Sequence, residues 1–357
     1  MLDSKLWEQV REMDYALESL IKIGIVFAAL ITTLAYVVLA ERKVSAYIQN
    51  RLGPNRVGPW GLLQPLADGL KFITKEDVVP NHVNKAIYIL APAVILIPAL
   101  MGFAIVPFGD AITVMGRRVE LIIANLDVGI LYVLALSSLG VYGVVLGGWA
   151  SNNKYALMGG VRASAQMISY ELSLGLSLIG VLMVSGTLRL TDLVNLQASS
   201  TLLGFLPSWF VFTQPVACIL FIVSVFAETN RLPFDLPEAE QELVAGYHAE
   251  YSSMKFAMFF MAEYAHMITA SALIATIFFG GWHLPGLDPA DDTLGVSLLK
   301  VLVFAVKTAF FLFVFIWVRW TVPRFRYDQV MRLGWKYLLP IALVNVFVTG
   351  LVLTLMR

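Results

Sequence analysis

Cysteine and histidine are scarce in this chain of 357 residues. The single cysteine is Cys218, and the four histidines are His82, His248, His266 and His283. A disulfide within the chain is therefore excluded, and an iron–sulfur cluster, which needs about four ligands, cannot be held by this chain alone. The histidines lack the spacing of metal ligands or haem ligands, so each is interpreted as a polar tip near an interface or a hydrogen-bonded core group. The sequence predicts no metal site.

Motifs for nucleotide and covalent chemistry are missing as well. The chain has no Walker A loop, no GxGxxG after a strand, and no Ser-His-Asp or HExxH pattern. Neither nucleotide hydrolysis nor hydride chemistry is therefore expected on this chain. Its formal net charge is zero, which removes any case for nucleic acid as a partner. Redox or energetic input must come from other proteins.

Charged residues are few, and long apolar runs take their place. The chain is 59% hydrophobic and 14% charged, whereas soluble domains have roughly 45–50% apolar and about 25% charged residues. Several runs reach the ~20 residues that an α-helix needs to cross the hydrocarbon core. The sequence therefore predicts an all-α, polytopic membrane protein with about eight transmembrane helices. No repeat or polar linker divides residues 1–357, so one integral-membrane domain is expected.

The eight predicted spans cover residues 23–40, 86–108, 128–150, 163–188, 211–227, 256–281, 301–318 and 337–356. The segment before the first span mixes both charges and lacks a small-residue cleavage site, so it is not read as a removable signal peptide. Loops after spans one, three, five and seven, with their span ends, hold 16 of the 25 Lys and Arg residues. By the positive-inside rule these loops face inward, and both termini lie on the opposite face.

The first inward loop, residues 41–85, carries a short amphipathic pattern after a Gly- and Pro-rich run. Leu66, Leu70 and Ile73 recur at helical spacing, and Pro65 suits the first helical turn. Next to Trp60, this pattern predicts a helix that lies in the membrane interface. The loop is interpreted as an inward docking loop.

Three predicted spans each carry one ionisable residue well inside them: Glu171, Glu263 and Lys307. A charge in mid-span is unfavourable by roughly 2.5–3.5 kcal/mol on insertion scales, so a functional role is the default hypothesis. The alternative is a hydrogen bond or ion pair between helices.

The second inward loop, residues 228–255, is strongly acidic. It contains Glu228, Asp235, Glu238, Glu240, Glu242 and Glu250. Some of these side chains are explained if Pro237 begins a helix through QELVAGYHAEY, because acids stabilise the N-terminal end of a helix. Carboxylates clustered near a low-dielectric medium also titrate as a coupled set, which is the chemistry of a proton relay. With Glu171 and Glu263, the relay would extend into the membrane.

Four long segments carry a family resemblance. They are AERKVSAYIQNRLGPNRVGPWGLLQPLADGLKFITKE, LMGGVRASAQMISYE, FAETNRLPFDLPEAEQELVAGYHAEYSSMKFAMFFMAEYAHM and VPRFRYDQVMRLGWKYLLP. They resemble the signature segments of the H subunit (also called subunit 1) of proton-pumping NADH:quinone oxidoreductase, respiratory complex I. The resemblance implies a membrane subunit of an H+-translocating enzyme, which builds the quinone access tunnel at the junction with the peripheral arm.

The resemblance also implies roles for individual residues. The proton path and coupling residues would be Glu41, Glu171, Glu228, Asp235, Glu238, Glu240, Glu242, Glu250 and Glu263. The residues of the quinone tunnel and its charged constriction would be Arg42, Gln49, Arg51, Trp60, Asp68, Arg231, Phe259, Phe260, Arg319, Arg324 and Arg326. For the arginines, positive-inside anchoring or docking to the peripheral arm stays an alternative.

The implied substrate is a quinone, either ubiquinone or menaquinone, and no cofactor is expected on this chain. Iron–sulfur clusters and FMN would lie on partner subunits, and the partners would be the peripheral quinone-site subunits, small and antiporter-like membrane subunits, and lipids. The implied location is a bacterial inner membrane or, alternatively, a mitochondrial one. Two other functions stay open: the related membrane subunit of a membrane-bound hydrogenase or ferredoxin-linked complex, and a stand-alone ion transporter.

Overall fold

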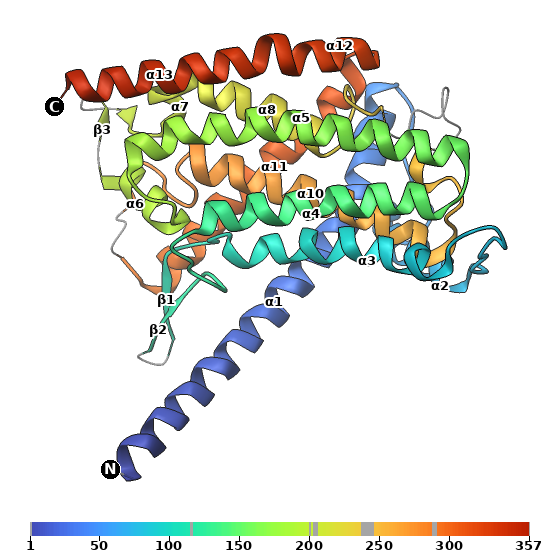
Figure 1. Ribbon diagram of the computed structural model, residues 1–357. Helices are drawn as coiled ribbons and strands as arrows, with labels where there is room; N and C mark the ends of the chain where they lie inside the picture. Colours follow the sequence, from blue (N-terminus) through green and yellow to red (C-terminus); the bar gives the residue numbers. More distant parts are fainter. Residues whose placement is uncertain are drawn as a thin grey trace.

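The computed structural model of the protein describes residues 2–114, 117–199, 201–202, 206–236, 246–287 and 291–356. Its longer helices run side by side in a bundle, which α1 crosses at a slant (Figure 1). These helices are α1 (Leu2–Ile48), α3 (Lys85–Met101), α4 (Gly129–Ala150), α5 (Lys154–Ser185), α8 (Pro215–Glu228), α10 (Ser253–Phe278), α11 (Leu294–Thr321) and α13 (Leu339–Leu355).

Shorter elements connect the long helices. They are the helices α2 (Gln64–Thr74), α6 (Leu190–Ser199), α7 (Phe210–Thr213) and α12 (Tyr327–Arg332), the 3₁₀ turns Pro59–Gly61, Gly102–Ile105 and Gly246–His248, and the π-helical turn Leu333–Leu338 that joins α12 to α13. Two antiparallel hairpins, β1 (Ala111–Val114) with β2 (Arg117–Glu120) and β3 (Thr201–Leu202) with β4 (Leu206–Pro207), lie outside the bundle (Figure 1). The predicted all-α class is confirmed.

Seven helical segments in the described residues are long and apolar enough to cross a membrane. They match seven of the eight predicted spans, so the chain is a polytopic membrane protein. The fifth predicted span differs, because Gln214 leaves helical geometry (φ −131°, ψ 56°) and Pro215 begins a new helix. The resulting α8 has 14 residues, about 21 Å, which is shorter than the ~30 Å hydrocarbon core.

The amphipathic helix expected in the first inward loop is present as α2, and Pro65 lies in its first turn. Leu66, Leu70 and Ile73 are 66%, 62% and 68% exposed, so the apolar face of α2 is not covered by the rest of the chain. Asp68, on the other face, forms an ion pair with Arg42 of α1. Both features suit a helix lying at a membrane interface.

Helix α10 is the most buried of the spanning segments. In its 18-residue apolar stretch, 72% of the residues are buried inside the protein. It packs against α1, α2, α3, α6, α8 and α11. Close approach elsewhere depends on small residues: a Cβ on Gly143 of α4 would lie 2.7 Å from Ile95 of α3, and one on Gly159 of α5 would lie 2.8 Å from Gly246. The charged residues inside the bundle are therefore held by tightly packed helices.

Both ends of the chain lie toward one end of the bundle, while α2 and α12 lie toward the other (Figure 1). This arrangement agrees with the charge pattern, which places the loops that carry α2 and α12 on the same face. The helix through QELVAGYHAEY, one of the two explanations of the acidic loop, does not extend over its described residues 246–251. There the chain forms a single 3₁₀ turn, Gly246–His248, before Ser252 precedes α10.

Candidate functional site: a buried ion-pair cluster and a polar pocket

Several predicted site residues meet where α1, the segment after α8, α10 and α11 come together. Arg231 Nη1 lies 3.1 Å from Glu41 Oε2 on α1, and Arg231 Nε lies 2.6 Å from Glu263 Oε1 on α10. Arg319 of α11 makes a second ion pair with Glu41, and the Tyr264 hydroxyl donates to Glu41 Oε2 at 2.8 Å. We call these five residues the buried ion-pair cluster.

Burial makes the interactions in this cluster strong. Glu41 and Arg231 are only 6% and 5% exposed, and the Arg231 guanidinium carbon lies 4.1 Å from the centre of the Tyr264 ring. Burial opposes the charge on Arg231, but Glu263 and Glu41 outweigh this effect and raise the pKa of Arg231 well above its ordinary value. Removing one partner would leave an uncompensated buried charge, which typically costs about 3–5 kcal/mol.

The cluster also contains an unsatisfied donor. Arg231 Nη2 is buried without a hydrogen-bond partner among the described residues. A buried guanidinium N–H group without an acceptor costs about 1–3 kcal/mol or more. A water molecule or a carbonyl oxygen from a ligand is the type of group that would satisfy it.

Asp235 lies beside this cluster and pairs with Arg324, whose Nη2 is 2.7 Å from Asp235 Oδ2. Burial raises the pKa of Asp235 above its ordinary value, although Arg324 and Arg319 oppose the shift. Gln166 of α5 holds this segment in place, because its Nε2 donates to Ala227 O and Phe234 O, each at 2.8 Å. The segment after α8 is thus fixed from two sides.

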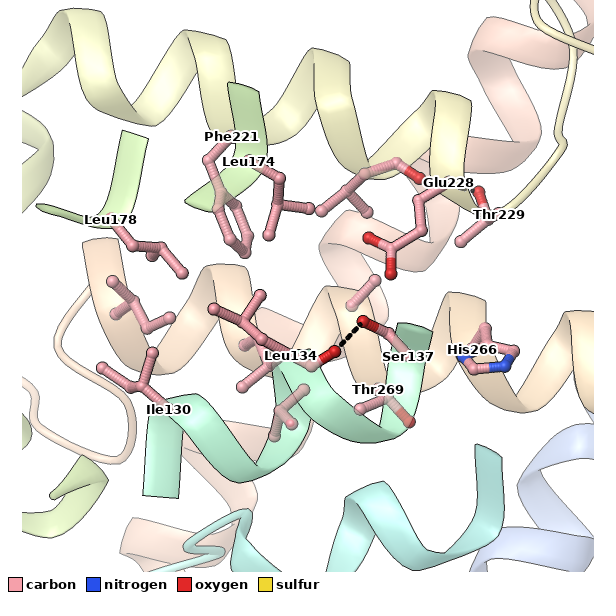
Figure 2. A pocket seen from close by; sticks show the side chains of 15 residues that line it. Ile130, Leu134, Ser137, Leu174, Leu178, Phe221, Glu228, Thr229, His266 and Thr269 are labelled. Carbon is pink, nitrogen blue, oxygen red and sulfur yellow. Dashed lines mark hydrogen bonds between the residues drawn. The ribbon is translucent and has the colours of Figure 1, made fainter. Parts of the chain in front are cut away.

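Glu228 and Glu171 lie deeper between the helices. Glu228, the last residue of α8, faces a pocket whose other polar walls include Ser137 of α4 and Thr269 of α10 (Figure 2). The Ser137 hydroxyl donates to Leu134 O at 3.0 Å and faces the Glu228 carboxylate (Figure 2). On α5, Glu171 accepts a hydrogen bond from the Ser138 hydroxyl and interacts electrostatically with Glu228.

Glu250 lies apart from the buried ion-pair cluster, beside the start of α5. Its carboxylate accepts a hydrogen bond from Asn153 Nδ2 at 2.7 Å, and His82 Nε2 lies 4.0 Å from its other oxygen. The backbone oxygen of Glu250 accepts from the Tyr88 hydroxyl at 2.7 Å. The predicted residues Glu238, Glu240 and Glu242 lie outside the described residues.

The residues predicted for a quinone tunnel fall into two groups. In the first, Arg42 pairs with Asp68 at 2.6 Å, Arg51 Nε donates to Gln49 Oε1 at 2.8 Å, and Trp60 is 81% exposed. All of these lie in or beside the first inward loop. Of these contacts, the Arg42–Asp68 pair joins α1 to α2.

The second group is aromatic and belongs to α10. Phe259 is 1% exposed and packs edge-on against Tyr247 and Tyr251, while Phe260 contacts His248 and Phe256. Phe259 is therefore covered by the chain itself and does not face lipid. Among the predicted arginines, Arg326 does not join the cluster, because it is exposed and lies 3.8 Å from Asp328.

The sequence did not predict a role for several polar residues of this region, namely Tyr264, Gln166, Ser137 and Ser138. Each is a single polar side chain within an apolar run, which is the available signal, but the sequence alone does not say which residue it faces. Among the described residues, no group of three or more His, Cys, Asp or Glu side chains is placed to hold a metal ion.

Comparison with known proteins gives consistent matches over nearly the whole chain. A family model described as NADH dehydrogenase matches residues 21–350. The NADH-quinone oxidoreductase H subunit 1 of Geobacter metallireducens is 52% identical over 96% of this chain and 98% of its own length. The H subunit 2 of Koribacter versatilis is 51% identical over 96% of this chain and 98% of its own, and the H subunit of Flavobacterium psychrophilum is 47% identical over 96% and 99%.

Proposed function

Since the chain belongs to the H-subunit family of NADH-quinone oxidoreductase, we propose that it forms the quinone access tunnel where the membrane and peripheral arms meet. In this role it couples quinone reduction to proton translocation through its acidic side chains. The substrate is ubiquinone or menaquinone, and electrons arrive from iron–sulfur clusters and FMN on partner subunits.

The observation that carries this proposal is the buried ion-pair cluster. This cluster holds two carboxylates and two guanidinium groups together between membrane-spanning helices: those of Glu41, Glu263, Arg231 and Arg319. Charges are costly there, and a functional role is the default explanation for them. Asp235 with Arg324 at one side and the Glu228 pocket at the other extend the set of ionisable groups.

The first inward loop supports a path for an apolar substrate with polar oxygens. The uncovered apolar face of α2 and the exposed Trp60 suit a membrane-embedded entry. Arg42 and Asp68 connect this entry to α1, one residue from Glu41. The unpaired Nη2 of Arg231 is a donor for which a quinone oxygen or a water molecule is a suitable acceptor.

Coupling follows from electrostatics in this arrangement. Reduction of a quinone creates negative charge and a demand for two protons near the inner end of the path. Negative charge draws on Arg231 and Arg319, whose ion pairs with Glu41 and Glu263 then weaken. Carboxylates that lose a cationic partner bind protons more readily, so protons move through Glu263, Glu228 and Glu171 toward the antiporter-like subunits.

The remaining partners are the peripheral quinone-site subunits and the small membrane subunits. The relatives are proteins of bacteria, and a bacterial inner membrane is accordingly the proposed location. The inward face, which carries most of the Lys and Arg residues, is the one that meets the peripheral arm.

The proposal is tested by Glu228→Gln in the assembled enzyme. The amide keeps the shape of the side chain but cannot release a proton. We expect NADH:quinone reductase activity and proton pumping to fall by about tenfold or more, since a positioned acid–base group contributes ~10²–10⁴-fold. Electron transfer from NADH to a water-soluble artificial acceptor should be unchanged.

Glu120→Gln is the matched control, because it makes the same chemical change on the exposed strand β2 and should leave turnover at the parental rate. Parental quinone reduction and pumping in Glu228→Gln would contradict the coupling role. Purification with a nickel–iron hydrogenase partner in place of NADH-oxidising subunits would contradict the assignment as a whole.

A further inference from the structure

The pocket beside Glu228 combines apolar walls with several polar side chains. It has a volume of about 50 Å3 open to the centres of water molecules, and it lies between α4, α5, α8 and α10. Its walls are largely apolar but include five polar side chains: Ser137, Glu228, Thr229, His266 and Thr269. Because one water molecule needs ~10–15 Å3 by this measure and two to four polar partners, the pocket has room and partners for a few water molecules.

His266 of α10 has a buried nitrogen without a partner. Its Nε2 makes no hydrogen bond within the part of the chain that the structure describes. The ring lies against Gly140 of α4, where a Cβ would come within 3.3 Å of Nε2, so the glycine leaves space for the imidazole. A buried polar atom without a partner costs about 1–3 kcal/mol, and water in the pocket would remove this cost.

The position of His266 connects two parts of the site. It lines the same pocket as Glu228 (Figure 2). On α10 it also follows Glu263 by three residues, a spacing that places the two side chains as neighbours on one side of a helix. Glu263 is one of the two carboxylates that pair with Arg231 in the buried ion-pair cluster. His266 therefore lies between the pocket and the cluster, which are otherwise separate groups of side chains.

We propose that the pocket holds a chain of water molecules joining the Glu228 carboxyl group to the His266 ring, and that His266 passes protons between Glu228 and Glu263. The inference rests on the proposed coupling role and adds a proton carrier to it. One proton leaves the Glu228 carboxyl group, crosses the waters and binds a ring nitrogen of His266, leaving a carboxylate and an imidazolium. The imidazolium then releases one proton toward Glu263 and returns to its neutral form.

The route has a carboxyl group at each end, Glu228 on α8 and Glu263 on α10, and Glu263 is paired with Arg231. Burial opposes the imidazolium, so the charged ring is a short-lived carrier between the two carboxyl groups. Imidazole is the side chain whose protonation changes most readily at physiological pH. These features suit a group that gains and loses a proton in each cycle.

The test uses the complete enzyme with His266→Asn, reconstituted in proteoliposomes. Asn remains polar and can bind water, but it cannot carry the proton. We expect quinone reduction coupled to pumping to fall by about tenfold or more, with a larger solvent deuterium isotope effect because proton transfer then limits the rate. His283→Asn makes the same substitution outside the pocket and should behave as the parent.

A second measurement does not depend on the variant. A high-resolution cryo-EM map of the parent enzyme should contain ordered water between Glu228 and His266, and a dry pocket would overturn the inference. So would a His266→Asn enzyme with parental rate and isotope effect, or a slow one whose isotope effect is unchanged. If Glu228→Gln is slow while His266→Asn is normal, only the role of His266 fails; if both are normal, the proposed function fails too.

Discussion

Lys307 is a charged residue inside α11 that the structure explains by its backbone partners. Its Nζ donates to the carbonyl oxygens of Phe279, Gly281 and His283 at 2.7, 2.9 and 2.7 Å. These bonds use all three donors of the ammonium group, and they lie at the C-terminal end of α10, where carbonyl groups attract cations. Hydrogen bonds to the backbone at and after the end of α10 therefore account for this residue, whereas Glu263 on α10 pairs with the side chain of Arg231.

His248 leads to a prediction about pH. Burial lowers the pKa of His248 to about 4, so the folded protein keeps this ring neutral, whereas the unfolded chain binds a proton near pH 6.5. The unfolded state therefore binds more protons between these values, and stability falls as the pH falls, by about 1–2 kcal/mol at pH 5. In the assembled enzyme, His248→Gln should lose less thermal stability between pH 7 and pH 5 than the parent.

The variant also loses the ring contacts of His248 with Phe256 and Phe260, which lowers its melting temperature at every pH. Each variant measurement is therefore compared with the parent enzyme at the same pH. Only the slope with pH reports on the charge. An equal decrease in the melting temperatures of the two proteins would contradict the prediction.

Among the secondary-structure elements, α2 depends on the turn before it for its position against α1. Gly61 has φ +75°, and a Cβ there would lie 2.2 Å from Pro54 O. A side chain would have to displace the backbone of the Gly- and Pro-rich run, since the clash is with a carbonyl group and not with a flexible side chain. The position of α2 against α1, through Arg42 and Asp68, thus depends on this turn.

We predict that Gly61→Ala will loosen the first inward loop. Strain at such a position costs about 1–3 kcal/mol, so the loop should be cleaved faster by protease and the apparent KM for quinone should rise. Gly69→Ala is the matched control, because Gly69 lies within α2 with no atom near its Cβ position. It should stabilise the helix by up to ~1 kcal/mol. Equal cleavage of the two variants would contradict the prediction.

In the whole molecule, the buried ion-pair cluster connects distant parts of the chain by ion pairs. Glu41, Arg231, Glu263 and Arg319 belong to four segments, and Arg231 lies 190 residues from Glu41. Packing of α10 at the centre of the bundle brings these segments together. The proposed coupling role and the assembly of the bundle therefore depend on the same side chains.

Arg231→Gln should weaken the whole bundle. It leaves Glu263 without its cation, and breaking a buried pair costs about 3–5 kcal/mol. We expect less assembled enzyme on native gels and a lower melting temperature. Arg231→Gln with Glu263→Gln should recover part of the loss, because the unpaired carboxylate is removed as well.

Arg326→Gln serves as the control for the loss of a positive charge. This arginine is exposed, and surface ion pairs contribute only ~0–1 kcal/mol. An Arg231→Gln enzyme that assembles and melts like the Arg326→Gln enzyme would contradict the structural role of the cluster.

Local patterns in the sequence were sufficient to predict most of the membrane-spanning helices. Seven spans and the amphipathic α2 were predicted from runs of apolar residues and from helical spacing, since both depend on neighbours along the chain. The prediction for the fifth span was too long, because a run of apolar residues does not reveal that Gln214 leaves helical geometry. The helix considered for QELVAGYHAEY does not extend over residues 246–251, since acidic residues and a proline suit several kinds of turn.

Apolar runs, charge pattern and long segments in the chain were enough to predict several membrane crossings, a positively charged face and a family resemblance. They could not predict which polar groups meet in the folded protein: Arg231 with Glu41 and Glu263, Lys307 with backbone carbonyls, and His266 with the pocket of Glu228. This difference follows from the range of the interactions. Insertion into a membrane depends on the sum of local hydrophobicity, whereas ion pairs depend on distances between residues far apart in sequence, which packing alone sets.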